Sequence, residues 1–125
     1  MKGHNPTSMR ERQALIPAGA FNFPIEKAHQ PRWFGFLLLR EFTLLAFSSA
    51  LDPLRIANQL SQKPLYGWRV FSEDGLPVPS SSGVDVSANA PLEEATPDMQ
   101  LFICSGNRWT DAAQDKTLSA LRRHQ

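Results

Sequence analysis

Two short segments of the sequence combine polar side chains with glycine in a way that could bind a small molecule. Glu41 and Phe42 follow a run of apolar residues, and Ser105, Gly106 and Asn107 follow a second such run. In open α/β sheets, sites form beyond the carboxyl ends of the strands. The main-chain N–H groups of Gly106 and Asn107, ahead of a predicted helix, could hold an anion or a carbonyl oxygen. A simple tight turn would explain the second segment equally well.

Cys104 and Glu41 are the two side chains that could take part in catalysis. A thiolate near a helix N-terminus is an activated nucleophile, and a carboxylate can act as a general acid or base. Against this, cysteine is often buried, and Cys104 ends an apolar strand. The three histidines, His4, His29 and His124, all lie outside the strand-end loops. The sequence therefore favours a structural thiol and a solvent-exposed carboxylate.

The composition excludes several classes of function. The chain has 125 residues, enough for one domain with a real core, and its 13 Lys plus Arg nearly balance 12 Asp plus Glu. The single cysteine excludes an internal disulfide and a cysteine-based metal cage. No Walker loop, GxGxxG motif or zinc spacing occurs, so we expect no cofactor and no metal. The sequence has neither a membrane-length apolar segment nor a secretory signal, so we expect a soluble cytoplasmic protein without membrane contact.

The elements that must position these residues begin with a strand and a helix. Residues 33–39 are almost continuously apolar, as in a parallel strand that is covered on both faces. Thr43 is a candidate N-cap for a helix that extends to about residue 60, with a kink expected at Pro53. We expect its second half to point Leu54, Ile56, Ala57 and Leu60 inward and Arg55, Asn58 and Gln59 outward.

The rest of the chain predicts an α/β domain with a parallel sheet. A second strand over 65–71 lies near a sheet edge, a turn over 72–77 leads to a small hairpin around residues 78–86, and 91–95 can form one helical turn. A third strand over 99–104 and an amphipathic helix over 111–123 follow. Only three long strands are present, so the sheet is expected to be incomplete. Residues 1–31, rich in proline and without hydrophobic periodicity, predict a flexible extension before the domain of residues 32–125.

Three stretches of the sequence resemble a known family. They are FGFLLLREFTLLAFSSALDPLRIANQL, YGWRVFSEDGLPVPSSSGVDV and DMQLFICSGN. They resemble the N-terminal sensor domain of GlxA-type AraC-family transcriptional regulators, which belongs to the PfpI-like, class I glutamine-amidotransferase-like superfamily. The resemblance covers about residues 33–123, and ALDPLRIANQ and the SEDG turn followed by SSSG are its most specific parts. It implies a flavodoxin-like parallel sheet sandwiched by helices, and we expect this sheet to be incomplete in the present chain.

The resemblance also implies a function and partners. Regulators of this type sense a small-molecule effector, and several members respond to arginine or to quaternary amines such as glycine betaine and carnitine. They bind DNA through a C-terminal pair of helix-turn-helix motifs, which is absent from this chain. A cytoplasmic homodimer is the expected assembly, with Glu41, Phe42, Ser105, Gly106 and Asn107 as ligand-binding residues.

Departures from the family's hydrolytic members argue against an enzyme. Those members carry a glutamate early in the first helix, where this chain has Ala46, and a Pro-Gly-Gly oxyanion loop, where this chain has Cys104, Ser105 and Gly106. Their nucleophilic cysteine ends the next strand, which would follow Gln125. We therefore expect no catalytic residue. Two alternatives stay open: a fragment of a PfpI-like cysteine hydrolase or glyoxalase-type enzyme, and a small stand-alone α/β protein that dimerises.

Overall fold

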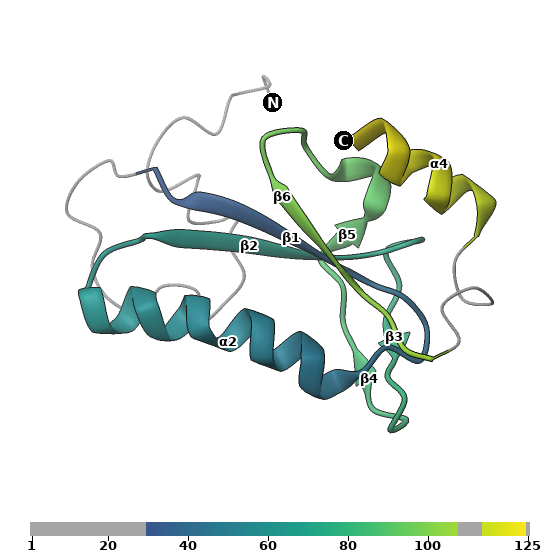
Figure 1. Ribbon diagram of the computed structural model, residues 1–125, viewed down its shortest axis with the longest axis horizontal. Helices are drawn as coiled ribbons and strands as arrows, with labels where there is room; N and C mark the ends of the chain where they lie inside the picture. Colours follow the sequence, from purple (N-terminus) through teal and green to yellow (C-terminus); the bar gives the residue numbers. More distant parts are fainter. Residues whose placement is uncertain (1–29, 108–113, 125) are drawn as a thin grey trace, which may run out of the picture.

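A parallel sheet of four strands organises the part of the chain that the computed structural model describes, residues 30–107 and 114–124. The strand order is β5-β2-β1-β6, and all three pairings are parallel (Figure 1). The strands are β1 (Arg32–Leu38), β2 (Tyr66–Ser72), β5 (Ala90–Pro91) and β6 (Gln100–Cys104). The parallel α/β architecture predicted from the sequence is thereby confirmed. Residues 1–29 of the predicted extension and residues 111–113 of the predicted last helix lie outside the described residues.

β1 lies at the centre of the sheet because its side chains are apolar on both faces. Phe36 pairs in register with Val70 of β2 and with Phe102 of β6. All residues from Phe34 to Leu39 are buried, as the sequence predicted for a strand covered on both sides.

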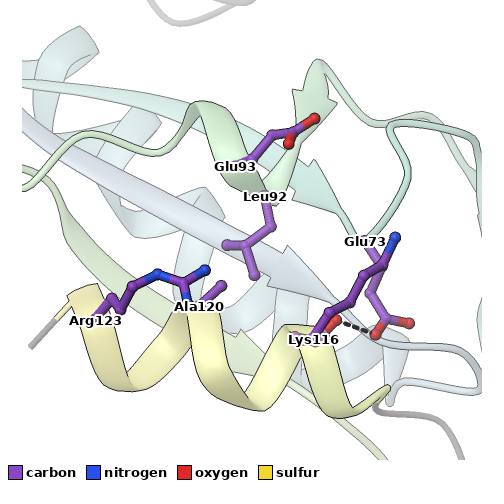
Figure 2. A pocket seen from close by; sticks show the side chains of 7 residues that line it. Glu73, Leu92, Glu93, Lys116, Ala120 and Arg123 are labelled. Carbon is purple, nitrogen blue, oxygen red and sulfur yellow. Dashed lines mark hydrogen bonds between the residues drawn. The ribbon is translucent and has the colours of Figure 1, made fainter.

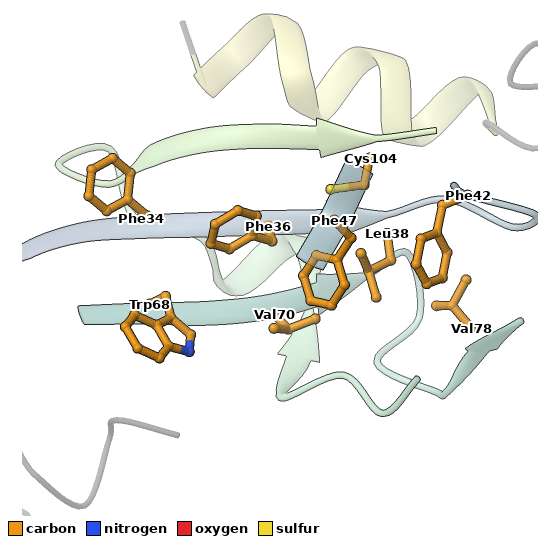
Figure 3. Close-up of a cluster of buried hydrophobic side chains, with 9 residues drawn as sticks. All are labelled: Phe34, Phe36, Leu38, Phe42, Phe47, Trp68, Val70, Val78 and Cys104. Carbon is orange, nitrogen blue, oxygen red and sulfur yellow. The ribbon is translucent and has the colours of Figure 1, made fainter. Parts of the chain in front are cut away.

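Successive side chains of β1 point to opposite faces of the sheet and enter two separate cores. Helix α2 (Leu44–Ser61) covers one face, and helix α4 (Asp115–His124) with the 3-10 helix η1 (Leu92–Glu94) covers the other (Figure 1). The first core is shown in Figure 3 and contains Phe34, Phe36, Leu38, Phe42, Phe47, Trp68, Val70, Val78 and Cys104. The second core contains Leu37, Leu39, Phe71, Ala90, Leu92 and Met99, against which Ala120 and Leu121 of α4 pack.

Helix α2 is continuous through Pro53, but its buried face differs from the predicted one. Ile56 and Leu60 are 42% and 81% exposed, whereas Asn58 is fully buried. The prediction that the first two point inward and the third outward was therefore wrong. Asn58 occupies the inner face because its amide hydrogen-bonds both main-chain polar groups of Tyr66, at 2.8 and 3.0 Å.

The remaining elements agree with the sequence prediction except for β5, which the sequence did not predict. β5 pairs only with Phe71 and Ser72 of β2, so the start of β2 lies at an edge of the described sheet. β3 (Val78–Pro79) and β4 (Asp85–Val86) form the predicted small hairpin. No helix among the described residues is long and apolar enough to cross a membrane.

Candidate ligand-binding site

The two predicted strand-end segments lie in direct contact. The Leu39 N–H donates to the carbonyl oxygen of Cys104 at 3.0 Å, and the Thr43 N–H donates to that of Ser105 at 3.2 Å. A Cβ atom on Gly106 would lie 2.2 Å from the carbonyl oxygen of Glu41. The loop after β6 can approach the loop after β1 this closely only because residue 106 has no side chain.

Glu41 has an exposed side chain on a left-handed main chain. Its φ angle is +61°, one of two positive values at non-glycine residues in the described chain. This conformation costs a non-glycine residue about 1–2 kcal/mol. The Glu41 N–H donates to the carbonyl oxygen of Pro79 at 2.8 Å, so the β3 segment helps to hold the turn. Strained main chain of this kind is enriched at functional sites, and the exposed carboxylate can pair with a cation.

Phe42 is fully buried and belongs to the first core. Its ring meets that of Phe47 edge to face, with centroids 5.9 Å apart. Its carbonyl oxygen accepts the Ser81 N–H at 2.8 Å. The Phe42 ring is therefore not exposed to a ligand, and its contribution to a site is to fix the turn that presents Glu41.

Ser105 and Gly106 are half-buried, and Asn107 is exposed. The Ser105 carbonyl oxygen is occupied by Thr43, but the N–H groups of Gly106 and Asn107 have no hydrogen-bond partner among the described residues. Two neighbouring N–H groups of this kind can donate hydrogen bonds to a carboxylate or to a carbonyl oxygen. Ligand binding by these loops stays a prediction.

Cys104 is buried in the first core and pairs in register with Leu38 of β1 (Figure 3). Loss of hydration raises the pKa of the Cys104 thiol to about 11. The thiol is therefore protonated at neutral pH and is a poor nucleophile. His124 cannot activate it, because the His124 Nε2 contacts the carbonyl oxygen of Met99, which precedes the opposite end of β6.

The first turn of α2 offers no acid for catalysis either, since Ala46 lies there with its side chain exposed. Among residues 30–107 and 114–124, no cluster of three or more His, Cys, Asp or Glu side chains could hold a metal ion.

A groove lies between η1 and α4, away from the strand-end loops (Figure 2). Charged side chains of both signs surround an apolar floor, and the lining residues are Glu73, Leu92, Glu93, Lys116, Thr117, Ala120 and Arg123. The sequence did not predict this groove. Glu73 belongs to the SEDG segment, which we predicted only to form a turn. The family resemblance of this segment was the only feature of the sequence that could have pointed to the groove.

Comparisons with known proteins identify relatives for more than half of the chain. The HTH-type transcriptional regulator GbdR of Pseudomonas aeruginosa is 42% identical over 76 residues, which are 61% of this chain and 21% of GbdR. The HTH-type transcriptional regulator GlxA of Rhizobium meliloti is 39% identical over 93 residues, 71% of this chain and 29% of GlxA. The chain thus spans between a fifth and a third of these relatives' length. No protein-family model matches it.

Solved structures agree with the sequence relatives. An AraC-family transcriptional regulator from Pseudomonas putida superposes with a TM-score of 0.60 and 27% identity, covering 75% of this chain and 52% of that one. A ThiJ/PfpI-family protein from Pseudomonas syringae has a TM-score of 0.57 at 14% identity, covering 80% of this chain and 43% of that one, and shares the fold alone. The likeness confirms the predicted fold class. The curated relatives named here are regulators, which supports the non-enzyme prediction over the hydrolase fragment.

Proposed function

This chain is a homologue of the GlxA-type AraC-family transcriptional regulators and matches part of their sensor domain, and we propose that it is the ligand-sensing part of such a regulator. The observation that carries the proposal is the 42% identity to GbdR over 76 residues. The contact between the loops after β1 and β6 supports an effector site there, because ligands of open α/β sheets bind beyond the carboxyl ends of parallel strands.

The effector is a small nitrogen-containing metabolite, an amino acid or a quaternary amine. The family resemblance motivates this choice, and two features of the loops are compatible with it. The exposed Glu41 carboxylate can pair with a cationic nitrogen. The N–H groups of Gly106 and Asn107 can donate hydrogen bonds to the carboxylate of the same molecule. Phe42 keeps the turn in place from within the core.

DNA binding belongs to a separate helix-turn-helix domain of the complete regulator, which acts as a homodimer in the cytoplasm. Effector binding would favour one arrangement of the sensor and DNA-binding domains over another and so change the affinity for DNA. This requires the effector to bind the two arrangements with different affinity.

The experiment that tests the proposal is a thermal-shift measurement with arginine, glycine betaine and carnitine. We expect at least one of them to raise the melting temperature, since a ligand that binds only the folded state stabilises it. The shift should be lost in Glu41→Gln and in Asn107→Pro, which removes the Asn107 N–H, and kept in Asp85→Asn, which changes an exposed carboxylate of β4. A chain that none of the three compounds stabilises would contradict the proposed effector class.

A further inference from the structure

Glu73 connects the turn after β2 to the beginning of α4. Its Oε2 accepts hydrogen bonds from the Gln114 N–H, at 2.9 Å, and from the Thr117 hydroxyl. These partners lie 41 and 44 residues later in the chain. Thr117 is only 3% exposed, and the dashed line in Figure 2 marks its bond to Glu73.

The Glu73 carboxylate acts as an N-cap supplied from another part of the fold. Helix α4 begins at Asp115, and the carbonyl oxygen of the preceding Gln114 accepts the Thr117 and Leu118 N–H groups at 3.0 and 3.1 Å. The first N–H groups of a helix have no partner within it, and a carboxylate satisfies them while it also complements the positive end of the helix dipole. Glutamine is not among the favoured N-cap residues. Glu73 therefore provides the side-chain acceptor that the residues at the start of α4 lack.

The neighbouring residues of the SEDG segment hold Glu73 in place. The Ser72 hydroxyl donates to the Leu76 carbonyl oxygen at 2.8 Å, and the Leu76 N–H donates to Asp74 at 3.0 Å. Gly75 has a φ angle of +83°, and a Cβ there would lie 3.1 Å from Pro91. The turn is thus closed by its own hydrogen bonds, which leaves the Glu73 side chain available for α4.

Helix α4 in turn packs on the second core, to which Leu37 of β1 also belongs. Leu121 packs against the second core, which contains Leu39. The N–H of the same Leu39 donates to Cys104 directly beside the contact between the two strand-end loops. The far end of α4 is fixed separately, by His124 on the carbonyl oxygen of Met99.

We propose that Glu73 is a positioning residue for the candidate ligand-binding site: it fixes where α4 begins and thereby stabilises the contact between the loops after β1 and β6. That the loops form a ligand-binding site rests on the proposed function, but the coupling between Glu73 and the contact of the two loops does not. It can be measured without any effector, so failure of the effector screen and failure of this inference are distinguishable.

The test is amide hydrogen exchange, measured by NMR on the folded chain, in Glu73→Ala and Glu73→Gln. In Glu73→Ala we expect about fivefold faster exchange at Thr117 and Leu118, as for the loss of an N-cap. Faster exchange should also appear at Leu39 and Thr43, whose N–H groups make the loop contacts. Glu73→Gln keeps an acceptor oxygen, so its effects should be smaller but in the same places.

Three controls distinguish a specific effect of Glu73 on the loop contact from a general destabilisation of the fold. Glu93→Gln changes a second glutamate of the same groove, and His124→Ala frees the other end of α4. Neither should accelerate exchange at Leu39 or Thr43. The Tyr66 amide, bonded to Asn58, should keep its protection in every variant. Unchanged exchange at Leu39 and Thr43 in both Glu73 variants, or an acceleration that Tyr66 shares, would overturn the inference.

Discussion

Gly106 and Glu41 touch through their main chains, although 65 positions separate them: a Cβ on Gly106 would lie 2.2 Å from the Glu41 carbonyl oxygen. Real Cβ atoms do not approach a main-chain oxygen that closely, so the contact requires glycine. The contact brings the main chain of Glu41, whose side chain is exposed, next to the loop of Gly106 and Asn107, whose N–H groups have no partner among the described residues.

Gly106→Ala should therefore destabilise the chain. The added methyl group must push the two loops apart, and we expect a loss of about 2–3 kcal/mol in the free energy of unfolding in urea. Gly83→Ala is the matched control, because Gly83 has a φ of +82° and no atom within 4 Å of its would-be Cβ. That variant should lose only about 1 kcal/mol, from backbone strain. Equal losses in the two variants would contradict the close contact.

Glu41→Gly should stabilise the chain while it removes the carboxylate. Glycine adopts a φ of +61° without the penalty that glutamate incurs, so the free energy of unfolding should rise by about 0.5–1 kcal/mol. Gln62→Gly, at the left-handed residue that ends α2, should give a similar gain. If Glu41→Gly is destabilising while Gln62→Gly is stabilising, the Glu41 side chain has a structural role that the exposed carboxylate does not suggest.

Asn58→Leu should be strongly destabilising even though it replaces a polar core residue with an apolar one. It leaves the N–H and the carbonyl group of Tyr66 without their partner, and each such loss costs about 1–3 kcal/mol. The exposed neighbour Gln59 provides the control, since Gln59→Leu should change stability by less than about 0.5 kcal/mol. A near-neutral Asn58→Leu would mean that water replaces the lost bonds.

Cys104 should make stability depend on pH in the alkaline range. Its thiol has an ordinary pKa of 9.0 in the unfolded chain and about 11 in the folded one. The folded state retains the proton longer, so the stabilisation is complete below pH 9 and is lost as the pH rises towards 11. Cys104→Ala should lack this part of the decline, measured by urea unfolding between pH 8 and about 11. Identical pH profiles for the two proteins would refute the raised pKa.

The fold was predictable where the hydrophobic pattern is simple. The apolar run of β1 predicted burial on both faces, and the order of strands and helices predicted a parallel sheet. The pattern misplaced Asn58, Ile56 and Leu60, because a hydrogen bond to β2 places an amide in the core and no periodicity encodes that pairing.

The location of the candidate site could be predicted from the sequence, but the contacts that hold its loops in place could not. A strand-end loop begins where an apolar run stops, so the sequence predicted that Glu41 and the Ser105–Asn107 segment lie at the strand ends. The burial of Phe42 could not be read locally, since it depends on the β3 hairpin and on Phe47 packing around it. Glu73 was also missed, because its partners lie more than 40 residues away.

The most direct test of the central claim is an NMR titration of the chain with arginine, glycine betaine and carnitine. At least one compound should produce saturable amide shifts that are concentrated at Glu41, Ser105, Gly106 and Asn107 and absent from Glu41→Gln. Saturable shifts that map instead to the groove between η1 and α4, or no saturable shift with any of the three, would contradict a nitrogen-metabolite site at the ends of β1 and β6.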